Sequence, residues 1–311
     1  MIADAARWRQ ADESEARWQA ELIAARVEAA SVTVRAHEFA GRRGWIALFG
    51  VSGIWFAFVP GGEVPVGYDA ARFAGTSEQN DSYAASAREF GLSLGIQEYI
   101  ASVTSPARVA VVPPLLVSVT ATEAGLVPVP PGHPEITGLL AGQQRQGQAP
   151  GQIEWHRRAR VTLDPDWTVT GAWLLEVPSY QQAVAQLAES GQRLLTADEW
   201  EHACGAGATT LFRWGDACPA GTDPCSAGTG LHREPNAFGL KIGQDPYRAE
   251  RTADPAVACG GDGGAMICGG AGEFVSWLTL ATAYRDVGFA GLLRGNDGQD
   301  AGLYLRPAIA L

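Results

Sequence analysis

The spacing of apolar residues near the start of the chain predicts helical structure. Residues 2–30 are Ala-rich and carry charges throughout, and their apolar residues form a rough stripe at helical spacing that Glu15 interrupts. The stripe consists of Trp8, Ala11, Trp18, Leu22 and Ala25. It predicts one or two helices that pack on the rest of the domain or on a second copy of the chain, with a partner-binding arm as the alternative.

Three apolar stretches further along predict buried strands. Residues 45–67 read as a strand pair that runs into a Pro-Gly-Gly turn. Residues 108–123 are β-branched and apolar and end in a turn, and residues 167–177 form another strand region. The longest apolar run, residues 45–60, is interrupted by Gly and Ser and is too short to span a membrane, so buried strands are the better interpretation.

Polar stretches separate these strands. Residues 69–103 are polar at first and then follow a helical pattern from residue 83 to residue 100. Residues 128–153 are rich in Pro, Gly and Gln, which predicts a surface loop. His133 lies between prolines in this loop and is not expected to be a metal ligand.

Two capping boxes predict the beginnings of two short helices. Ser179 is followed three residues later by Gln182, and Thr196 by Glu199. In the second helix, Leu195 and Trp200 are placed to form a hydrophobic staple. Glycines are expected to end both helices, at Gly191 for the first and at Gly205 and Gly207 for the second.

Composition places the chain among compact, loop-rich proteins. Its 311 residues are 46% apolar and 18% charged and include 38 glycines, enough for one large domain or two small ones. The formal net charge of −11 argues against binding to a nucleic-acid backbone. An odd number of cysteines, five, and an N-terminus without an apolar signal segment lead us to expect a reducing, cytoplasmic location. The Ala/Gly/Arg-biased composition leads us to expect a bacterial source.

A longer pattern surrounds the second capping box. Between residues 193 and 216 the chain reads Arg-Leu-x-Thr-x-x-Glu-Trp-Glu-x-Ala, then Gly-x-Gly, then aromatic-x-Trp-Gly-Asp. This pattern resembles the signature of the formylglycine-generating enzyme family, the sulfatase-modifying factors. The segment ending in Pro-Gly-Gly-x-Val-x-Val-Gly at residue 67, the 108–123 strand and the closing Gly-Leu-Tyr-Leu-Arg-Pro are similar to other parts of that family.

The resemblance implies an α+β domain with a loop-rich variant of the C-type lectin fold. It extends with gaps from about residue 45 to the end of the chain. We therefore expect residues 43–311 to form the formylglycine-generating-enzyme-like domain and residues 1–42 to form an N-terminal helical extension, through which copies of the chain could associate.

A long irregular stretch, residues 216–273, follows the signature. It is rich in Gly, Asp and Asn, and in a compact domain such a stretch needs something to hold it. The resemblance implies a structural calcium site formed by Asn236, Asp245 and the carbonyl groups of Ala237 and Tyr247, and these are oxygen ligands that calcium prefers. The alternative is that Asn236 and Asp245 only stabilise turns through their side chains.

Several departures from the family concern its chemistry. Residues 271–277 resemble a Gly-Asn-x-x-Glu-Trp segment of the family, but Glu273 replaces the Asn and Ser276 the Glu. Oxygen-using members hold copper with two cysteines shortly after an Arg-Gly-Gly-Ser-type strand. Here Arg294-Gly-Asn-Asp-Gly is the only segment similar to that strand, and residues 269–311 contain no cysteine. Iron-dependent relatives need a histidine-bearing helical domain, whereas the five histidines of this chain are scattered.

The sequence therefore favours a non-catalytic binding or assembly module, with an unidentified protein or small ligand. The rival interpretation is a metal-dependent oxidoreductase of the same family with a relocated active site. That enzyme would use a metal together with some of four cysteines: Cys218, Cys225, Cys259 and Cys268.

Overall fold

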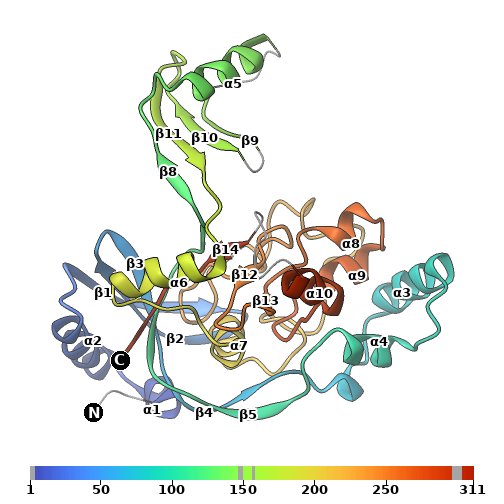
Figure 1. Cartoon of the computed structure of the whole chain (residues 1–311). Helices are drawn as coiled ribbons and strands as arrows, with labels where there is room; N and C mark the ends of the chain where they lie inside the picture. The colour runs from blue at the N-terminus through green and yellow to red at the C-terminus, as the bar shows by residue number, and fades with distance from the viewer. Residues whose placement is uncertain (1–3, 146–149, 156–157, 296–302) are drawn as a thin grey trace.

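The computed structural model describes residues 4–145, 150–155, 158–295 and 303–311, and the statements below concern these residues. The chain combines helices with mainly antiparallel sheets, in agreement with the expected α+β class. Figure 1 shows a compact body from which a smaller arm projects. None of the described helices is both long enough and apolar enough to cross a membrane.

The largest sheet is antiparallel and has the strand order β1-β2-β3-β6-β15. Its strands are β1 (Ser31–Phe39), β2 (Arg42–Val51), β3 (Ile54–Val59), β6 (Leu115–Ser118) and β15 (Ala308–Ala310). The first two helices, α1 (Ala5–Gln10) and α2 (Glu13–Arg26), pack on this sheet and bury Trp8 and Ile23 against Phe49, Phe56 and Phe58. The predicted strand pair at residues 45–67 is confirmed as β2 and β3.

The predicted N-terminal extension needs two corrections. Residues 1–42 are not only helical, because β1 lies within them and pairs with β2 along nine residues. The expected apolar stripe is also wrong in part, since Trp18 is 45% and Leu22 41% exposed. The buried side of α2 instead carries Ala16, Gln19, Ala20 and Ile23, and its two alanines let the helix approach the sheet closely.

Helix α7 (Ala197–Gly205) forms the second layer of the body. The Thr196 side chain accepts a hydrogen bond from the Glu199 N–H at 3.2 Å, and the Glu199 carboxylate accepts one from the Thr196 N–H at 2.8 Å. The predicted capping box is therefore confirmed, as is the one that begins α6 (Tyr180–Glu189). The residue that takes the left-handed conformation after α7 is Ala206, at φ +47°, between the two expected glycines.

The hydrophobic core lies between α7, the large sheet and a two-stranded ribbon. Strands β4 (Gly62–Val66) and β5 (Arg108–Val112) form the ribbon. Leu195 and Trp200 are 1% exposed and share one cluster with the inner face of the ribbon and with β3 and β6, as the staple predicts. The predicted strand at residues 108–123 is divided by Pro113 and Pro114 into β5 and β6, followed by the short β7 (Thr122–Glu123).

The helical prediction for residues 83–100 is confirmed with an interruption. A 3₁₀ turn, η1 (Ala70–Arg72), precedes α3 (Ser77–Phe90), and α4 (Ile96–Ser102) follows. Gly91, at φ +65°, ends α3, because a left-handed residue cannot continue a right-handed helix.

The arm corrects the prediction for residues 128–153. These residues are not simply a surface loop, since they contain α5 (Pro134–Arg145) and β9 (Gln152–Trp155). The arm sheet has the order β8-β11-β10-β9, with β8 (Leu126–Pro128), β10 (Ala159–Leu163) and the predicted 167–177 strand, β11 (Val169–Leu175). Ile136 and Leu140 lie one helical turn apart and pack on this sheet, a spacing that the surrounding Gly and Gln residues obscure.

The stretch from residue 216 to residue 273 is mostly irregular, as predicted. Its regular pieces are β12 (Glu250–Arg251), β13 (Ala258–Cys259) and α8 (Ala265–Cys268). They are followed by α9 (Glu273–Leu278), α10 (Val287–Gly295) and β14 (Tyr304–Leu305), and a small sheet joins β13, β12, β14 and β7. Arg294 lies in α10, so it is not part of a strand, and residues 296–298 of the segment similar to the family's strand lie outside the described residues.

Candidate functional site

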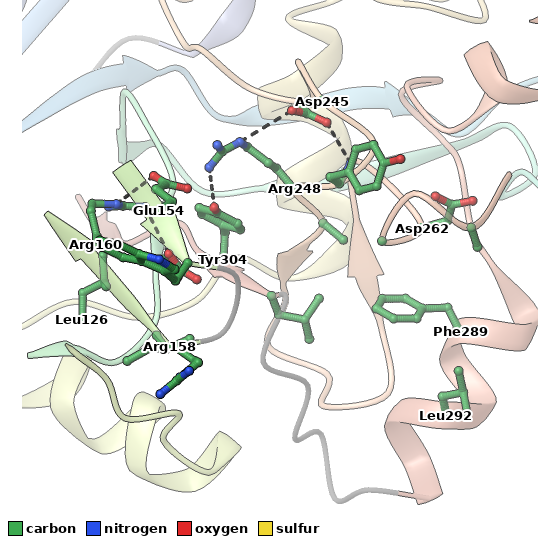
Figure 2. Close-up of a pocket in the computed structure, with 18 of the residues that line it drawn as sticks. Leu126, Glu154, Arg158, Arg160, Asp245, Arg248, Asp262, Phe289, Leu292 and Tyr304 are labelled. Atoms are coloured by element: carbon green, nitrogen blue, oxygen red, sulfur yellow. Dashed lines mark hydrogen bonds and ion pairs between the residues drawn. The ribbon is translucent and has the colours of Figure 1, made fainter. Parts of the chain in front are cut away.

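A cavity of about 700 Å³ lies where the arm meets the body. Three walls surround it, formed by arm strands β9 and β10, by residues 245–249, and by residues 262–265 together with α10. Tyr304 of β14 also lines the cavity. Figure 2 shows Glu154 and Arg160 on the arm side, and Phe289 and Leu292 projecting from α10 on the opposite side.

The arm wall is held to the body by Arg160. Its guanidinium forms ion pairs with Glu154 of β9 at 2.8 Å and with Glu123 of β7 at 3.1 Å. Because the side chains of Arg160 and Glu123 are 21% and 17% exposed, this pair is less screened than a surface pair. The positive charge of Arg160 is therefore balanced by two carboxylates. Because Glu123 belongs to the body, the pair with Glu123 also links the arm to the body.

The second wall presents an arginine stacked on an aromatic ring. The Arg248 guanidinium lies 4.9 Å from the centre of the Tyr304 ring and donates a hydrogen bond to the Tyr304 hydroxyl. It also forms a looser ion pair with Asp245 at 3.7 Å (Figure 2). Asp245 accepts a hydrogen bond from the Tyr247 N–H at 2.9 Å, which turns the chain so that Tyr247 and Arg248 both line the cavity.

The Tyr247 ring packs directly against Gly264. A Cβ atom at Gly264 would lie 2.0 Å from the ring, and Gly264 has φ +85°, so only glycine fits there. The Tyr247 hydroxyl contacts the Cys268 sulfur at 3.0 Å, and this hydrogen bond raises the pKa of Tyr247 to about 12. Tyr247 therefore presents a neutral ring to the cavity at physiological pH.

The third wall carries two carboxylates, Asp262 and Asp286. Asp262 is 3% exposed, and its two oxygens accept hydrogen bonds from the N–H groups of Gly264 at 2.8 Å and Met266 at 2.9 Å. Asp286 accepts the Phe289 N–H at 2.8 Å in the first turn of α10. Neither carboxylate forms an ion pair with any described residue.

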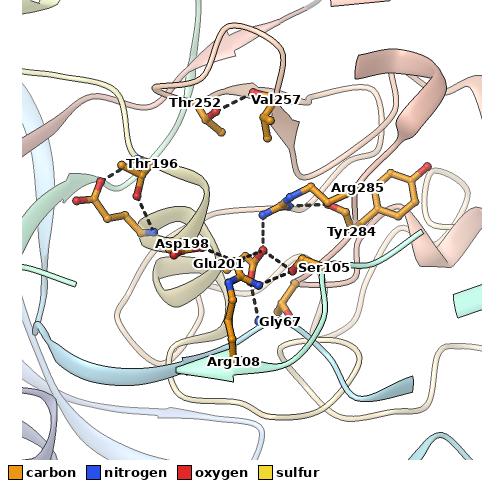
Figure 3. Close-up of polar contacts among 12 residues, drawn as sticks. Gly67, Ser105, Arg108, Thr196, Asp198, Glu201, Thr252, Val257, Tyr284 and Arg285 are labelled. Atoms are coloured by element: carbon orange, nitrogen blue, oxygen red, sulfur yellow. Dashed lines mark hydrogen bonds and ion pairs between the residues drawn. The ribbon is translucent and has the colours of Figure 1, made fainter. Parts of the chain in front are cut away.

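A buried network joins this wall to α7. The Glu201 carboxylate accepts hydrogen bonds from the Gly67 N–H and from the Ser105 hydroxyl, both at 2.6 Å, and forms ion pairs with Arg285 and Arg108 (Figure 3). The Arg285 N–H also donates to the Val103 carbonyl at 2.8 Å. Helix α7 thereby fixes the segment that leads into Asp286 and α10.

Tyr284 lies in the same segment. Its side chain is 2% exposed, and its hydroxyl makes no hydrogen bond with the described residues. Burial raises the pKa of Tyr284, and the charges of Asp286 and Asp262, together with a long side-chain contact to Asp286, raise it further. A buried hydroxyl without a partner is costly, which makes this group unusual in the fold.

The four residues predicted to bind calcium occupy two different environments. Asn236 is fully buried, and its amide donates to the carbonyls of Ala203 and Cys204 at 2.6 and 3.0 Å. Its oxygen accepts the N–H groups of Phe238 and Leu240, each at 3.0 Å, while Ala237 is half-buried.

Asp245 and Tyr247 lie at the cavity, and among the described residues they share no hydrogen-bond partner with Asn236. These contacts give Asn236 a role in ending α7 and give Asp245 the turn geometry of the alternative interpretation. The described residues contain no group of three or more His, Cys, Asp or Glu side chains arranged to hold a metal ion.

Calcium binding by Asn236, Ala237, Asp245 and Tyr247 stays a prediction with a direct test. An ion that binds only the native state raises the melting temperature as its concentration rises. If calcium holds this region, EDTA should lower the melting temperature and speed proteolysis between residues 216 and 273 before the rest of the chain is cut. Identical melting curves and digestion patterns in calcium and in EDTA would leave only the turn-forming roles.

The cysteines named for the oxidoreductase interpretation are dispersed and unpaired. Cys259 is fully buried, and burial raises the pKa of its thiol to about 12. Cys218 lies against Gln79 at 3.4 Å, and Cys225 lies 3.7 Å from Asp245, so that burial and then Asp245 raise the Cys225 pKa to about 12. Thiols with raised pKa values are weak nucleophiles and weak metal ligands near neutral pH. Cys268 is exposed and contacts Tyr247.

No protein-family model matches the chain, and comparison with curated proteins gives no significant match. Inspection of the sequence singled out two of the cavity residues, Asp245 and Tyr247, but as calcium ligands, and it missed the others. The one local signal is Asp286 three residues before Phe289, a spacing typical of a helix N-terminus. Nothing in the sequence indicates that β9, residues 245–265 and α10 meet.

Proposed function

We propose that this chain is a non-catalytic binding module, a formylglycine-generating-enzyme-like variant of the C-type lectin fold, whose ligand occupies the cavity between arm and body. The observation that carries the proposal is the cavity itself. Its volume of about 700 Å³ falls within the range of roughly 300–1,000 Å³ typical of small-molecule sites. We also propose that the protein is cytoplasmic and that copies of the chain associate through the N-terminal helices.

The chemistry of the cavity wall supports binding over catalysis. The described side chains that line it are aromatic, aliphatic, arginine and carboxylate, and include no cysteine or histidine. Two of its three arginines are committed to structural contacts within the cavity, Arg160 with Glu123 and Glu154, and Arg248 with Tyr304. Such a wall combines apolar surface with a few fixed polar groups, as ligand sites do.

The alternative is a metal-dependent oxidoreductase with relocated chemistry. Two contacts favour it, because Cys268 touches Tyr247 at the edge of the cavity and Cys225 lies against Asp245. Metal analysis of protein purified without added metals distinguishes the two functions. Stoichiometric copper, iron or zinc would support the enzyme, whereas calcium or no metal would support the binding module.

The protein is expected not to oxidise a sulfatase-type Cys-x-Pro-x-Arg peptide to formylglycine. The reason is the missing C-terminal cysteine pair, because two thiolates are what the family's copper chemistry needs. The measurement is mass spectrometry of the peptide after incubation with the protein, copper and a thiol reductant. Turnover of the peptide would contradict the non-catalytic proposal.

A fragment screen tests the binding function without assuming the charge of the ligand. Neutral, anionic and cationic fragments are compared by thermal shift on the wild type and two variants of α10. Leu292→Trp adds bulk at a residue that lines the cavity, whereas Val287→Trp places the same side chain on the same helix at a residue that does not line it. Both positions are exposed, so both variants should fold.

Fragments that stabilise the wild type and Val287→Trp but not Leu292→Trp would support the proposal. If no fragment of the library gives this pattern of stabilisation, the result would contradict the proposal.

A further inference from the structure

We propose that the cavity binds an organic cation, an amidinium, guanidinium or ammonium group, with Asp262 and Asp286 as its counter-ions. This inference rests on the proposed binding function and names the chemical class of its ligand.

The balance of charge in the cavity is the first argument. Among the described residues, its lining contains five carboxylates and three arginines. Arg160 pairs with Glu123 and Glu154, Arg248 pairs with Asp245, and Arg158 pairs at 3.1 Å with Glu135 outside the cavity. Within the described structure, Asp262 and Asp286 are the lining carboxylates left without an ion pair. A ligand that balances the charge of the cavity would therefore carry a positive group and place it at the third wall.

The second argument is the cost of leaving these groups as they are. Asp262 is nearly fully buried, and burial raises its pKa, with Asp286 adding repulsion. Two neighbouring carboxylates in a partly desolvated site repel each other, and a bound cation relieves that repulsion. The wall is thus less stable empty than occupied by a positive group.

The third argument concerns a buried hydroxyl in the segment that leads into Asp286. The Tyr284 hydroxyl is buried and makes no hydrogen bond of normal geometry with the described residues, and burial and then the charges of Asp286 and Asp262 raise its pKa. Buried polar groups of native proteins almost always have a partner. A ligand group held by the acid pair brings polar atoms to the surroundings of this hydroxyl.

The aromatic side chains favour an organic cation over a metal ion. Tyr247, Tyr304 and Phe289 line the same cavity, and ring faces attract amidinium and ammonium groups. Arg248 stacked on Tyr304 already shows this contact within the chain. Calcium, in contrast, takes about six to eight oxygen ligands, and the third wall offers two unpaired carboxylates. An anionic ligand is disfavoured, because the arginines that line the cavity already form ion pairs with carboxylates of the chain.

Benzamidine and benzamide provide the test. They have nearly the same shape, but only benzamidine is charged, so the difference in their affinities measures the preference for a cation. Binding is followed by calorimetry and by thermal shift on the full chain, with calcium chloride as a separate probe. We expect saturable benzamidine binding that weakens with salt, and at least tenfold weaker binding of benzamide.

Three variants locate the interaction. Asp286→Asn keeps an oxygen for the Phe289 N–H and should weaken benzamidine binding about tenfold or more, whereas Asp81→Asn, on exposed α3, should leave it unchanged. Tyr284→Phe removes a hydroxyl without a protein partner, so it should weaken binding while stability stays equal or rises.

The outcomes separate the inference from the proposed function. Equal affinities for benzamidine and benzamide, or unchanged binding by Asp286→Asn, would overturn the inference. Calcium binding at this wall without benzamidine binding would also overturn it. If neutral or anionic fragments enter the cavity while benzamidine does not, the binding function stands and only the cation assignment fails.

Discussion

Replacing Trp200 by alanine should lower the free energy of unfolding by about 3–5 kcal/mol, the range for truncating a buried aromatic residue. Trp200 is 1% exposed, and its indole N–H donates to the Glu250 carboxylate at 2.8 Å. The chain also passes so close to the ring that a Cβ atom at Gly260 would lie 2.8 Å from it. Truncation therefore leaves both a cavity and a buried carboxylate with one donor fewer.

Urea denaturation measures this change, with Trp18→Ala as the control. Trp18 is 45% exposed on α2, so its truncation should change stability by less than about 1 kcal/mol. A loss below about 1 kcal/mol for Trp200→Ala would mean that α7 is not packed as described.

The second large effect is expected at Arg306. Arg306→Met should cost about 3–5 kcal/mol, because removing one member of a buried ion pair leaves the other charge uncompensated. The side chains of Arg306 and Glu250 are 2% and 3% exposed and lie 2.6 Å apart. Arg306 also donates to the carbonyls of Ser118 and Lys241, at 2.6 and 2.8 Å, so it joins β6 to the loop before β12.

A double-variant cycle separates the charge effect from the lost hydrogen bonds. Glu250→Gln keeps an acceptor for Trp200 but removes the negative charge, so together with Arg306→Met it should cost roughly 0.5–3 kcal/mol less than the sum of the single changes. Arg43→Met, which breaks the exposed pair with Glu38, should change stability by at most about 1 kcal/mol. Strict additivity of the two core changes would show that the charges are not coupled.

Local chemistry explains which parts of the fold were predictable. The two capping boxes depend on residues three positions apart, and both form as predicted. The strands of the main sheet follow from short apolar runs. Trp18 departs from the rule that a large apolar residue faces the core, because the close packing of α2 on the sheet requires small residues such as Ala16 and Ala20.

The cavity was not predictable from the sequence, because it depends on long-range contacts and not on local patterns. Its described walls come from residues 123–126, 154–155, 158–160, 175, 245–249, 262–265, 286–292 and 303–304, which the fold brings together through contacts far apart in the sequence. Glu201 illustrates this point, because in the sequence it is one more charged residue of a capped helix. In the structure it fixes Arg285, and through it the segment that carries Tyr284 and Asp286. The expected calcium ligands depended on resemblance alone, and Asn236 has its amide engaged with α7 and the backbone after it.

The most direct test of the binding function is a chemical-shift map of the wild-type chain titrated with the fragments that stabilise it. The account predicts that the backbone amides whose signals shift are concentrated in residues 154–155, 158–160, 245–249, 262–265 and 286–292, the described segments that surround the cavity. Shifts concentrated elsewhere, such as on α2 or on the outer face of the β4–β5 ribbon, with these segments unchanged, would contradict it.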